Sequence, residues 1–260
     1  MDTNKQLFDA IRKLMNHIPK SWVELTTHRL DIYDEKLAKS EFLSQFEALL
    51  LSESYSTEAL DSLPTAYDYI RLGHQLSSVL EWFLAKLNQV PSDQVITFAS
   101  CTMPLLAILR RDALAQNPTH IYHDLDSSPL LDETRLRSIY GYQFDVKQVT
   151  NASEIPEHQL GTTLFVTQSS YQTPLTNHVN IDATINRHPQ FGATIVIHKS
   201  PALDPQVTEM VKDVQHVRRR ETIAMTPPNA LKVLNEMVLN VSSGVELIHN
   251  DNLQIVHQCI

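Results

Sequence analysis

Hydrophobic side chains recur every three or four positions through the first third of the chain, and no run there alternates as a strand would. The spacing is clearest over residues 34–52 and again over residues 72–87. The segment 62–65 holds a proline and interrupts it. The pattern therefore predicts helices over residues 1–90, with residues 90–93 as the linker to the second part of the chain.

After residue 93 the pattern changes to short apolar runs that alternate with helical spacing. Such alternation is typical of an α/β sheet domain. The predicted strands are 95–99, 121–123, 144–149, 162–167 and 192–198. Three helices are predicted: one begins near Leu105, one covers residues 181–187 and one begins near Glu209. Residues 235–241 and 244–249 are expected to form a closing antiparallel hairpin, turning at residues 242–244.

The first of these units has the order strand, turn, helix, strand, acid, which is the first half of a dinucleotide-type βαβ unit. In such a unit the turn 100–102 and the helix N-terminus can face a polar group, and Asp124 can accept the ribose hydroxyls. The turn has no glycine, because Ala99 and Cys101 stand where a close cofactor favours one. An ordinary α/β crossover is therefore an equal alternative.

Composition excludes several classes of protein. The 260 residues are 42% hydrophobic and 20% charged, with a net charge of −9, which argues against a polyanion-binding protein. Two cysteines and twelve scattered histidines form no zinc pattern, so no metal is expected. No apolar run reaches the roughly 20 residues of a membrane helix, and we expect a cytoplasmic protein without nucleic-acid or membrane partners.

The predicted fold class is α/β, an N-terminal helical bundle followed by a class I methyltransferase-like, Rossmann-type domain. Residues 1–90 would form a helical cap that holds substrate. Residues 91–260 would form the domain that binds S-adenosylmethionine.

Several motifs, taken in order, resemble the nicotianamine synthases and their microbial relatives that make opine-type metallophores. The resemblance rests on residues 67–72, the turn 98–105 and the acidic stretch 124–129, and Glu41 and Glu47 keep the family's six-residue spacing. The likeness spans about residues 35 to 250. The family's turn contains two glycines that this chain lacks, and its arginine after the fifth strand is absent from 198–201.

The resemblance implies transfer of the 3-amino-3-carboxypropyl group of S-adenosylmethionine to an amine such as that of histidine, releasing methylthioadenosine, in metallophore biosynthesis. Glu41 would be the catalytic base, although a solvated helix charge is the simpler interpretation. Tyr69 would position the amine or be a core residue. The residues that would contact S-adenosylmethionine are Phe98, Ser100, Cys101, Thr102, Asp124, Asp126, Gln168 and Ser169.

Other functions stay open beside this one. A conventional methyltransferase would use the same fold and Asp124 without needing Glu41, and a non-catalytic nucleoside-binding relative would explain the missing glycines. The run from Phe98 to Leu109 also resembles the turn of pyridoxal-phosphate enzymes, but no lysine-bearing strand is evident after it. The expected partner is a small amino-acid acceptor, and a homodimer is left open.

Overall fold

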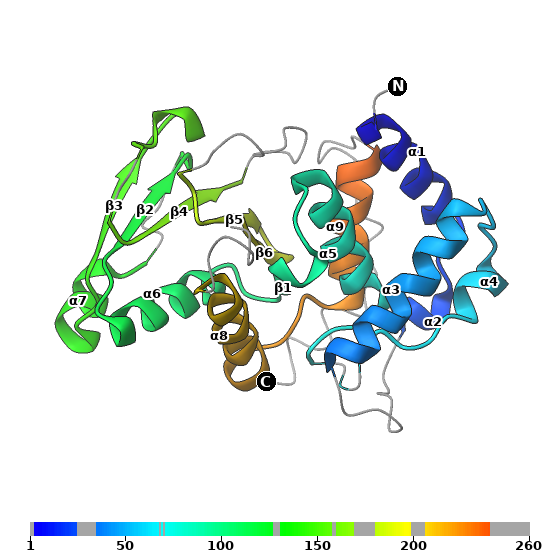
Figure 1. Cartoon of the computed structure of the whole chain (residues 1–260), viewed down its shortest axis with the longest axis horizontal. Helices are drawn as coiled ribbons and strands as arrows, with labels where there is room; N and C mark the ends of the chain where they lie inside the picture. Colours follow the sequence, from blue (N-terminus) through cyan, green and yellow to red (C-terminus); the bar gives the residue numbers. More distant parts are fainter. Residues whose placement is uncertain are drawn as a thin grey trace.

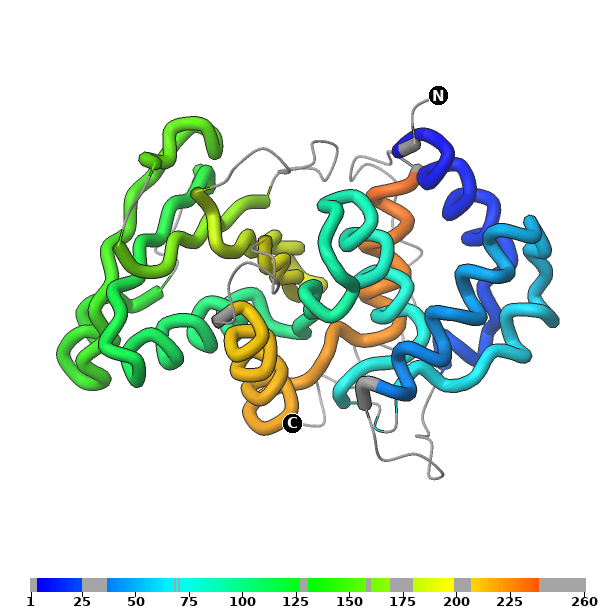
Figure 2. The backbone as a smooth tube through the Cα atoms, in the orientation of Figure 1, coloured from blue at the N-terminus to red at the C-terminus, as the bar shows by residue number. Residues whose placement is uncertain are grey.

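The structure is a computed structural model that describes residues 3–24, 35–67, 69, 71–126, 131–157, 160–168, 180–198 and 206–239. A group of helices that includes α1 lies beside a β-sheet with its own flanking helices (Figures 1 and 2). The helices are α1 (Thr3–Met15), α2 (Lys20–Val23), α3 (Glu35–Leu51), α4 (Thr57–Asp61), α5 (Gln75–Asn88), α6 (Met103–Ala115), α7 (Glu133–Tyr140), α8 (Gln206–Glu221) and α9 (Pro227–Leu239), with 3-10 turns η1 (Ser92–Gln94) and η2 (Ala152–Glu154). The strands are β1 (Val95–Phe98), β2 (Thr119–His123), β3 (Phe144–Gln148), β4 (Thr162–Thr167), β5 (Ala183–His188) and β6 (Gly192–Ile197).

The described strands form one mixed sheet in the order β1-β6-β5-β4-β2-β3. Strands β5, β4, β2 and β3 run parallel, and β6 is antiparallel to both of its neighbours, β5 and β1. Every described strand except β6 therefore ends at the same edge of the sheet. We call this the carboxyl edge.

The strand order shows that the predicted methyltransferase-like, Rossmann-type domain is wrong. A dinucleotide-type unit places its first two strands side by side. Here β1 is an outer strand, and β6, β5 and β4 separate it from β2. Four strand spacings of about 4.8 Å put the ends of β1 and β2 about 19 Å apart. The α/β class was predicted correctly, but the turn after β1 and the acid after β2 do not form one nucleoside site.

The sheet buries its two faces against different helices. On one face, alternate residues such as Phe98, Ile185 and Ile195 form a core with Ile108 of α6 and Val214 of α8. On the other face, near β1 and β6, the helical part covers the sheet through a second core. That core joins Val95 and Val196 of the sheet to residues of α1, α3, α5 and α9.

Helix α9 packs with the N-terminal helices although it belongs to the C-terminal half of the sequence. It contacts α5 and α1 (Figure 1) and buries Val233, Leu234 and Met237. The predicted division at residues 90 and 91 remains a prediction. Within the described residues, no helix is both long and apolar enough to span a membrane.

Two predicted elements are wrong. Residues 181–187 were predicted as a helix, but Ala183–His188 is strand β5, with buried Ala183 and Ile185 at strand spacing. Residues 235–239 belong to helix α9 rather than to a hairpin. Prolines at its start fix the helical backbone angle, and the apolar spacing after them is helical. The rest of the predicted hairpin lies outside the described residues.

Candidate functional site

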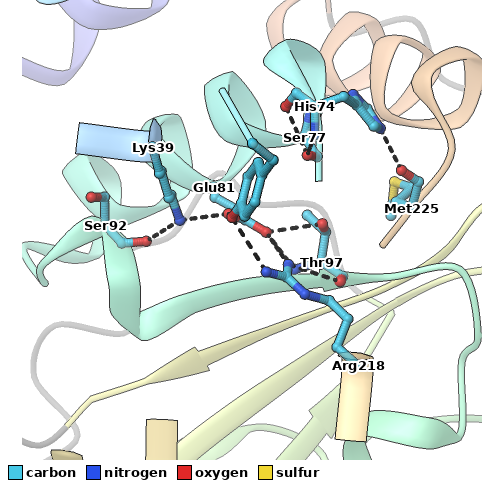
Figure 3. Close-up of polar contacts among 9 residues, drawn as sticks. Lys39, His74, Ser77, Glu81, Ser92, Thr97, Arg218 and Met225 are labelled. Carbon is cyan, nitrogen blue, oxygen red and sulfur yellow. Dashed lines mark hydrogen bonds and ion pairs between the residues drawn. The ribbon is translucent and has the colours of Figure 1, made fainter. Parts of the chain in front are cut away.

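A cluster of charged side chains lies buried where α3, α5, α8 and β1 meet (Figure 3). The Glu81 carboxylate, with no exposed surface, accepts hydrogen bonds from Lys39 Nζ at 2.6 Å and Arg218 Nη1 at 2.8 Å. It also accepts from the Thr97 N–H at 2.9 Å, the Thr97 hydroxyl at 3.0 Å and the Tyr67 hydroxyl at 3.2 Å. We call these residues the Glu81 cluster.

The charges in this cluster balance one another. Burial alone would raise the pKa of Glu81, but the charges of Lys39 and Arg218 outweigh it and lower the pKa to about 2. Burial would lower the pKa of Lys39, but Glu81 holds it above its ordinary value. Because Glu81 also accepts the N–H of Thr97 from outer strand β1, the cluster closes that edge of the sheet. It therefore holds the fold together rather than forming a binding site.

A buried histidine fixes the start of α5 in the same region. His74 Nδ1 accepts the Ser77 N–H at 3.1 Å, and Nε2 lies 2.7 Å from the carbonyl oxygen of Met225. Since a carbonyl can only accept, Nε2 carries the proton and the ring is neutral. Burial lowers the pKa of His74 to about 4, so this anchor is stable in its neutral form.

The predicted cofactor turn lies between β1 and α6, as the sequence indicated. The Ser100 hydroxyl accepts the N–H groups of Thr102 and Met103 at 3.2 and 3.3 Å, so it binds two backbone N–H groups at the start of α6. The Cys101 thiol donates to the carbonyl oxygen of Gly192 at 3.1 Å. Phe98 itself is buried in the core under α6. The turn is thus held against the end of β5 and the start of β6.

The other predicted contacts gather at the ends of β2 and β4. Asp124 accepts a hydrogen bond from the Thr167 hydroxyl at 2.7 Å. Asp126 and Gln168 come after the two strands and are exposed, while Ser169 lies outside the described residues. The structure therefore brings Asp124 and Gln168 to neighbouring strands but separates both from the turn after β1.

The two predicted catalytic residues belong to the helical part. Glu41 is half-buried on α3, which lies far from β2 (Figure 1). Tyr69 is partly buried against the helical core and precedes α5 rather than starting it. Glu47 accepts from Trp82 Nε1 at 2.6 Å and from Lys86 Nζ at 2.8 Å, so it ties α3 to α5. The catalytic roles of Glu41 and Tyr69 stay predictions.

A row of polar side chains crosses the sheet on the face opposite the α6 core. Strand pairing aligns Thr97 with Thr194, Thr194 with Asn186, and Asn186 with Thr167. Asp124 continues the row through its bond to Thr167. We call these five residues the polar row. Buried polar groups destabilise a fold unless they are bonded. Thr97 and Thr167 are bonded, to Glu81 and Asp124.

Asn186 occupies the middle of the row, in β5. The residue is only 9% exposed. Its amide atoms keep some exposed surface and make no hydrogen bond with any residue that the structure describes. Sequence reasoning missed it because residues 181–187 were predicted as a helix. The strand alternation of Ala183 and Ile185 with Thr184 and Asn186 was the available signal.

His188 ends β5 on the same face as Asn186. Its Nε2 lies 3.4 Å from the Thr194 hydroxyl. Burial lowers the pKa of His188 to about 3, so the ring is neutral near pH 7 and can donate or accept one hydrogen bond at each nitrogen. The carboxyl edge therefore combines a carboxylate, an amide, hydroxyls and a neutral imidazole.

The opposite edge of the sheet is hollowed at the starts of β2 and β3, over about 490 Å³. Its charged side chains and His120 have partners. His120 Nδ1 lies 2.7 Å from Asp145, and Arg137 stacks on Phe144 at 4.1 Å and pairs with Glu133. In the described residues, no group of histidine, cysteine or acidic side chains is arranged to hold a metal.

No family model and no curated protein matches the chain. Solved structures that it resembles include metB from Corynebacterium glutamicum (11% identity, TM-score 0.42, covering 66% of this chain and 53% of that one). Cystathionine gamma synthase from Xanthomonas oryzae pv. oryzae has 12% identity and a TM-score of 0.44, over 76% of this chain and 59% of that one. O-acetylhomoserine sulfhydrylase from Wolinella succinogenes has 11% identity and a TM-score of 0.38, over 64% and 62%.

The predicted family is therefore corrected. These structures are of pyridoxal-phosphate-dependent enzymes, and none is a nicotianamine synthase. The predicted aminocarboxypropyl transfer in metallophore biosynthesis and the predicted S-adenosylmethionine co-substrate are wrong on the same comparison, and the sheet order agrees. The chain spans little more than half of the first of these structures.

Proposed function

We propose that this chain is an enzyme that binds a small polar metabolite of amino-acid size at the carboxyl edge, over the polar row. The observation that carries the proposal is Asn186, a residue that is only 9% exposed and whose amide makes no hydrogen bond with the described residues. Leaving a buried amide without a partner destabilises a protein by roughly 1–3 kcal/mol. A ligand that supplies the missing hydrogen bonds accounts for retaining it.

The position of the row supports a ligand site. Open α/β sheets bind ligands outside the carboxyl ends of their strands, where the strand order reverses. In this sheet the chain moves outward from β2 to β3 and then returns to β4. Asp124 and Thr167 end the two strands on either side of that reversal, and Asn186 lies on the next strand.

The side chains define the chemistry that the ligand needs. Asp124 holds the Thr167 hydroxyl through one carboxylate oxygen, which leaves the other for an amine or hydroxyl donor. Asn186 offers a donor and an acceptor, and His188 is uncharged near pH 7. The row therefore favours a neutral or zwitterionic molecule with an amino or hydroxyl group at one end and an amide-like or carboxyl group at the other.

Pyridoxal phosphate, the cofactor of the compared enzymes, does not fit the described residues. Such enzymes hold it through a lysine Schiff base and an acid at the pyridine nitrogen. No described lysine lies at the carboxyl end of β1, β2, β4 or β5, and Lys147 is exposed on outer strand β3. Asp124 could serve as the acid, but the turn at Ser100 that could hold a phosphate is about 19 Å away.

Binding is tested by titrating the full chain with amino acids, their amides, nucleosides and pyridoxal phosphate, and measuring the melting temperature and the heat of binding. We expect one amino-acid-like class to bind saturably and to raise the melting temperature. Asn186→Ala should weaken that binding roughly tenfold or more, because it removes a buried hydrogen-bonding partner. Mass spectrometry of the binding compound after incubation then tests for turnover.

Asn88→Ala is the matched control. Asn88 donates to the Leu84 carbonyl at the end of α5, at 2.8 Å, so its loss should leave binding unchanged. Equal affinity of wild type and Asn186→Ala would place the ligand elsewhere. A borohydride-stable adduct with pyridoxal phosphate would show that a lysine outside the described residues reaches the edge, and would replace this proposal.

A further inference from the structure

The residue after Asn186 offers a second binding group, on the other face of the sheet. Arg187 lies two positions after Ile185 and therefore projects to the face that α6 covers. Its guanidinium makes no hydrogen bond or ion pair with the described residues, and its Nε is fully buried. An arginine in this setting normally pairs with a carboxylate or phosphate.

Its surroundings favour an anion. Strand pairing places Arg187 beside Ala193 and Ala193 beside Phe98, so Arg187 is two strands, or about 10 Å, from the end of β1. Helix α6 begins just after that end, and the bond between the Cys101 thiol and the Gly192 carbonyl, at 3.1 Å, keeps the intervening turn beside the end of β5. The positive end of the α6 dipole therefore lies on the same side as the Arg187 guanidinium, which has no partner among the described residues.

A second nitrogen at the same edge also lacks a partner. His123 ends β2, and its Nδ1 is buried without a hydrogen bond to any described residue. Pairing aligns His123 with Val166 of β4, which belongs to the α6-side core, so His123 projects to the same face as Arg187. Both nitrogens are hydrogen-bonding groups that an oxyanion could use.

We propose that Arg187 forms an anion-binding site at the carboxyl edge, on the α6 side, for a carboxylate or phosphate group of a small molecule. The site rests on Arg187 and does not depend on whether the polar row binds a metabolite. A molecule that reaches around the end of β5 would engage both Asn186 and Arg187, since consecutive strand residues point to opposite faces.

The test uses the full chain with nitrogen-15 labelling and two titrants, inorganic phosphate and acetate. The Nε–H signal of Arg187, assigned by its disappearance in Arg187→Lys, should move saturably with one or both anions. The titrant that saturates at the lower concentration identifies the group that the site prefers. Arg187→Gln should weaken binding of that anion roughly tenfold or more, because it removes a charged hydrogen-bond donor.

Arg219→Gln is the control, since Arg219 is exposed on α8, and it should change the affinity by less than about twofold. Arg187→Lys keeps the charge but not the paired donors and should bind at an intermediate level. An Nε–H signal that neither anion moves, or equal losses in Arg187→Gln and Arg219→Gln, would overturn the proposal. Asn186→Ala leaves this test unaffected, so failure here and failure of the metabolite site can be told apart.

Discussion

The polar row differs between its outer end at β1 and its middle at β5 in whether its polar side chains are hydrogen-bonded by the described residues. At β1, Thr97 donates its hydroxyl and its N–H to Glu81, which also binds Lys39 and Arg218. Two strands away, Asn186 is also buried but makes no bond with the described residues. Both places bury polarity at a cost in free energy. The first place serves the fold, and we propose that the second serves a ligand.

The largest effect is expected from breaking the satisfied end. Glu81→Gln keeps the shape of the side chain but leaves Lys39 and Arg218 buried without their counter-charge. Removing one partner of a buried ion pair destabilises a protein by about 3–5 kcal/mol, and we expect a loss of that size in urea unfolding. Glu47→Gln, on a half-exposed acid bound to Lys86, should lose about 1 kcal/mol or less. Similar losses in both variants would mean that the cluster adds nothing beyond surface pairing.

Acid separates the two regions by the pH at which each loses stability. Burial lowers the folded pKa of His188 from 6.5 to about 3. As the pH drops below 6.5, the unfolded chain therefore binds a proton before the folded chain does, and the folded state loses stability. By pH 4.5 the loss in the free energy of unfolding that is due to His188 amounts to about 2–3 kcal/mol. Glu81, whose folded pKa is lowered to about 2, acts only below its ordinary value of 4.5 and loses its contribution toward pH 2.

Urea unfolding at a series of pH values measures this. His188→Asn should flatten the decline between pH 6.5 and 4.5, leaving the part due to His74, whose folded pKa is about 4. His216→Asn, at an exposed position on α8, should leave the decline unchanged. A profile in His188→Asn that superimposes on wild type would show that His188 is not buried as a neutral ring.

Much of the local structure could be read from the sequence, but the arrangement of the strands could not. The runs at 162–167 and 192–198 were found because β-branched and aromatic residues fill buried strands. The order of the strands depends on pairs such as Val95 with Val196, which lie a hundred residues apart and leave no local pattern. A βα alternation therefore looks the same whether β1 is central or at the edge.

The site was only partly predictable for a related reason. Asp124 was placed correctly at the end of its strand, because an acid after a short apolar run indicates that position. Its neighbour in space, Thr167, comes from a strand forty residues later, and the pairing that makes them contact is not local. Asn186 was missed because a six-residue strand with one isoleucine resembles a helix turn.

A smaller change tests the satisfied end of the row without breaking its ion pairs. Thr97→Val keeps the shape of the side chain and removes the 3.0 Å hydrogen bond to Glu81. Hydrogen bonds to charged groups contribute about 1.5–3 kcal/mol, so we expect a loss in that range in urea unfolding. Thr163→Val, on the same buried face in β4, is the comparison for replacing a threonine by valine. A loss no larger than in the comparison would show that Glu81 is satisfied without Thr97.

The smallest effect is expected at the unsatisfied position, and its sign is opposite. Asn186→Leu replaces an amide that bonds to none of the described residues by an apolar group of similar size. The ligand-free protein should therefore be unchanged or stabilised, by up to about 1 kcal/mol. The same variant should lose the stabilisation that the bound metabolite gives to wild type. Urea unfolding with and without the ligand measures both quantities. A destabilisation of more than about 1 kcal/mol in the absence of ligand would mean that Asn186 serves the fold as Thr97 does, and the contrast between the two parts of the row would disappear.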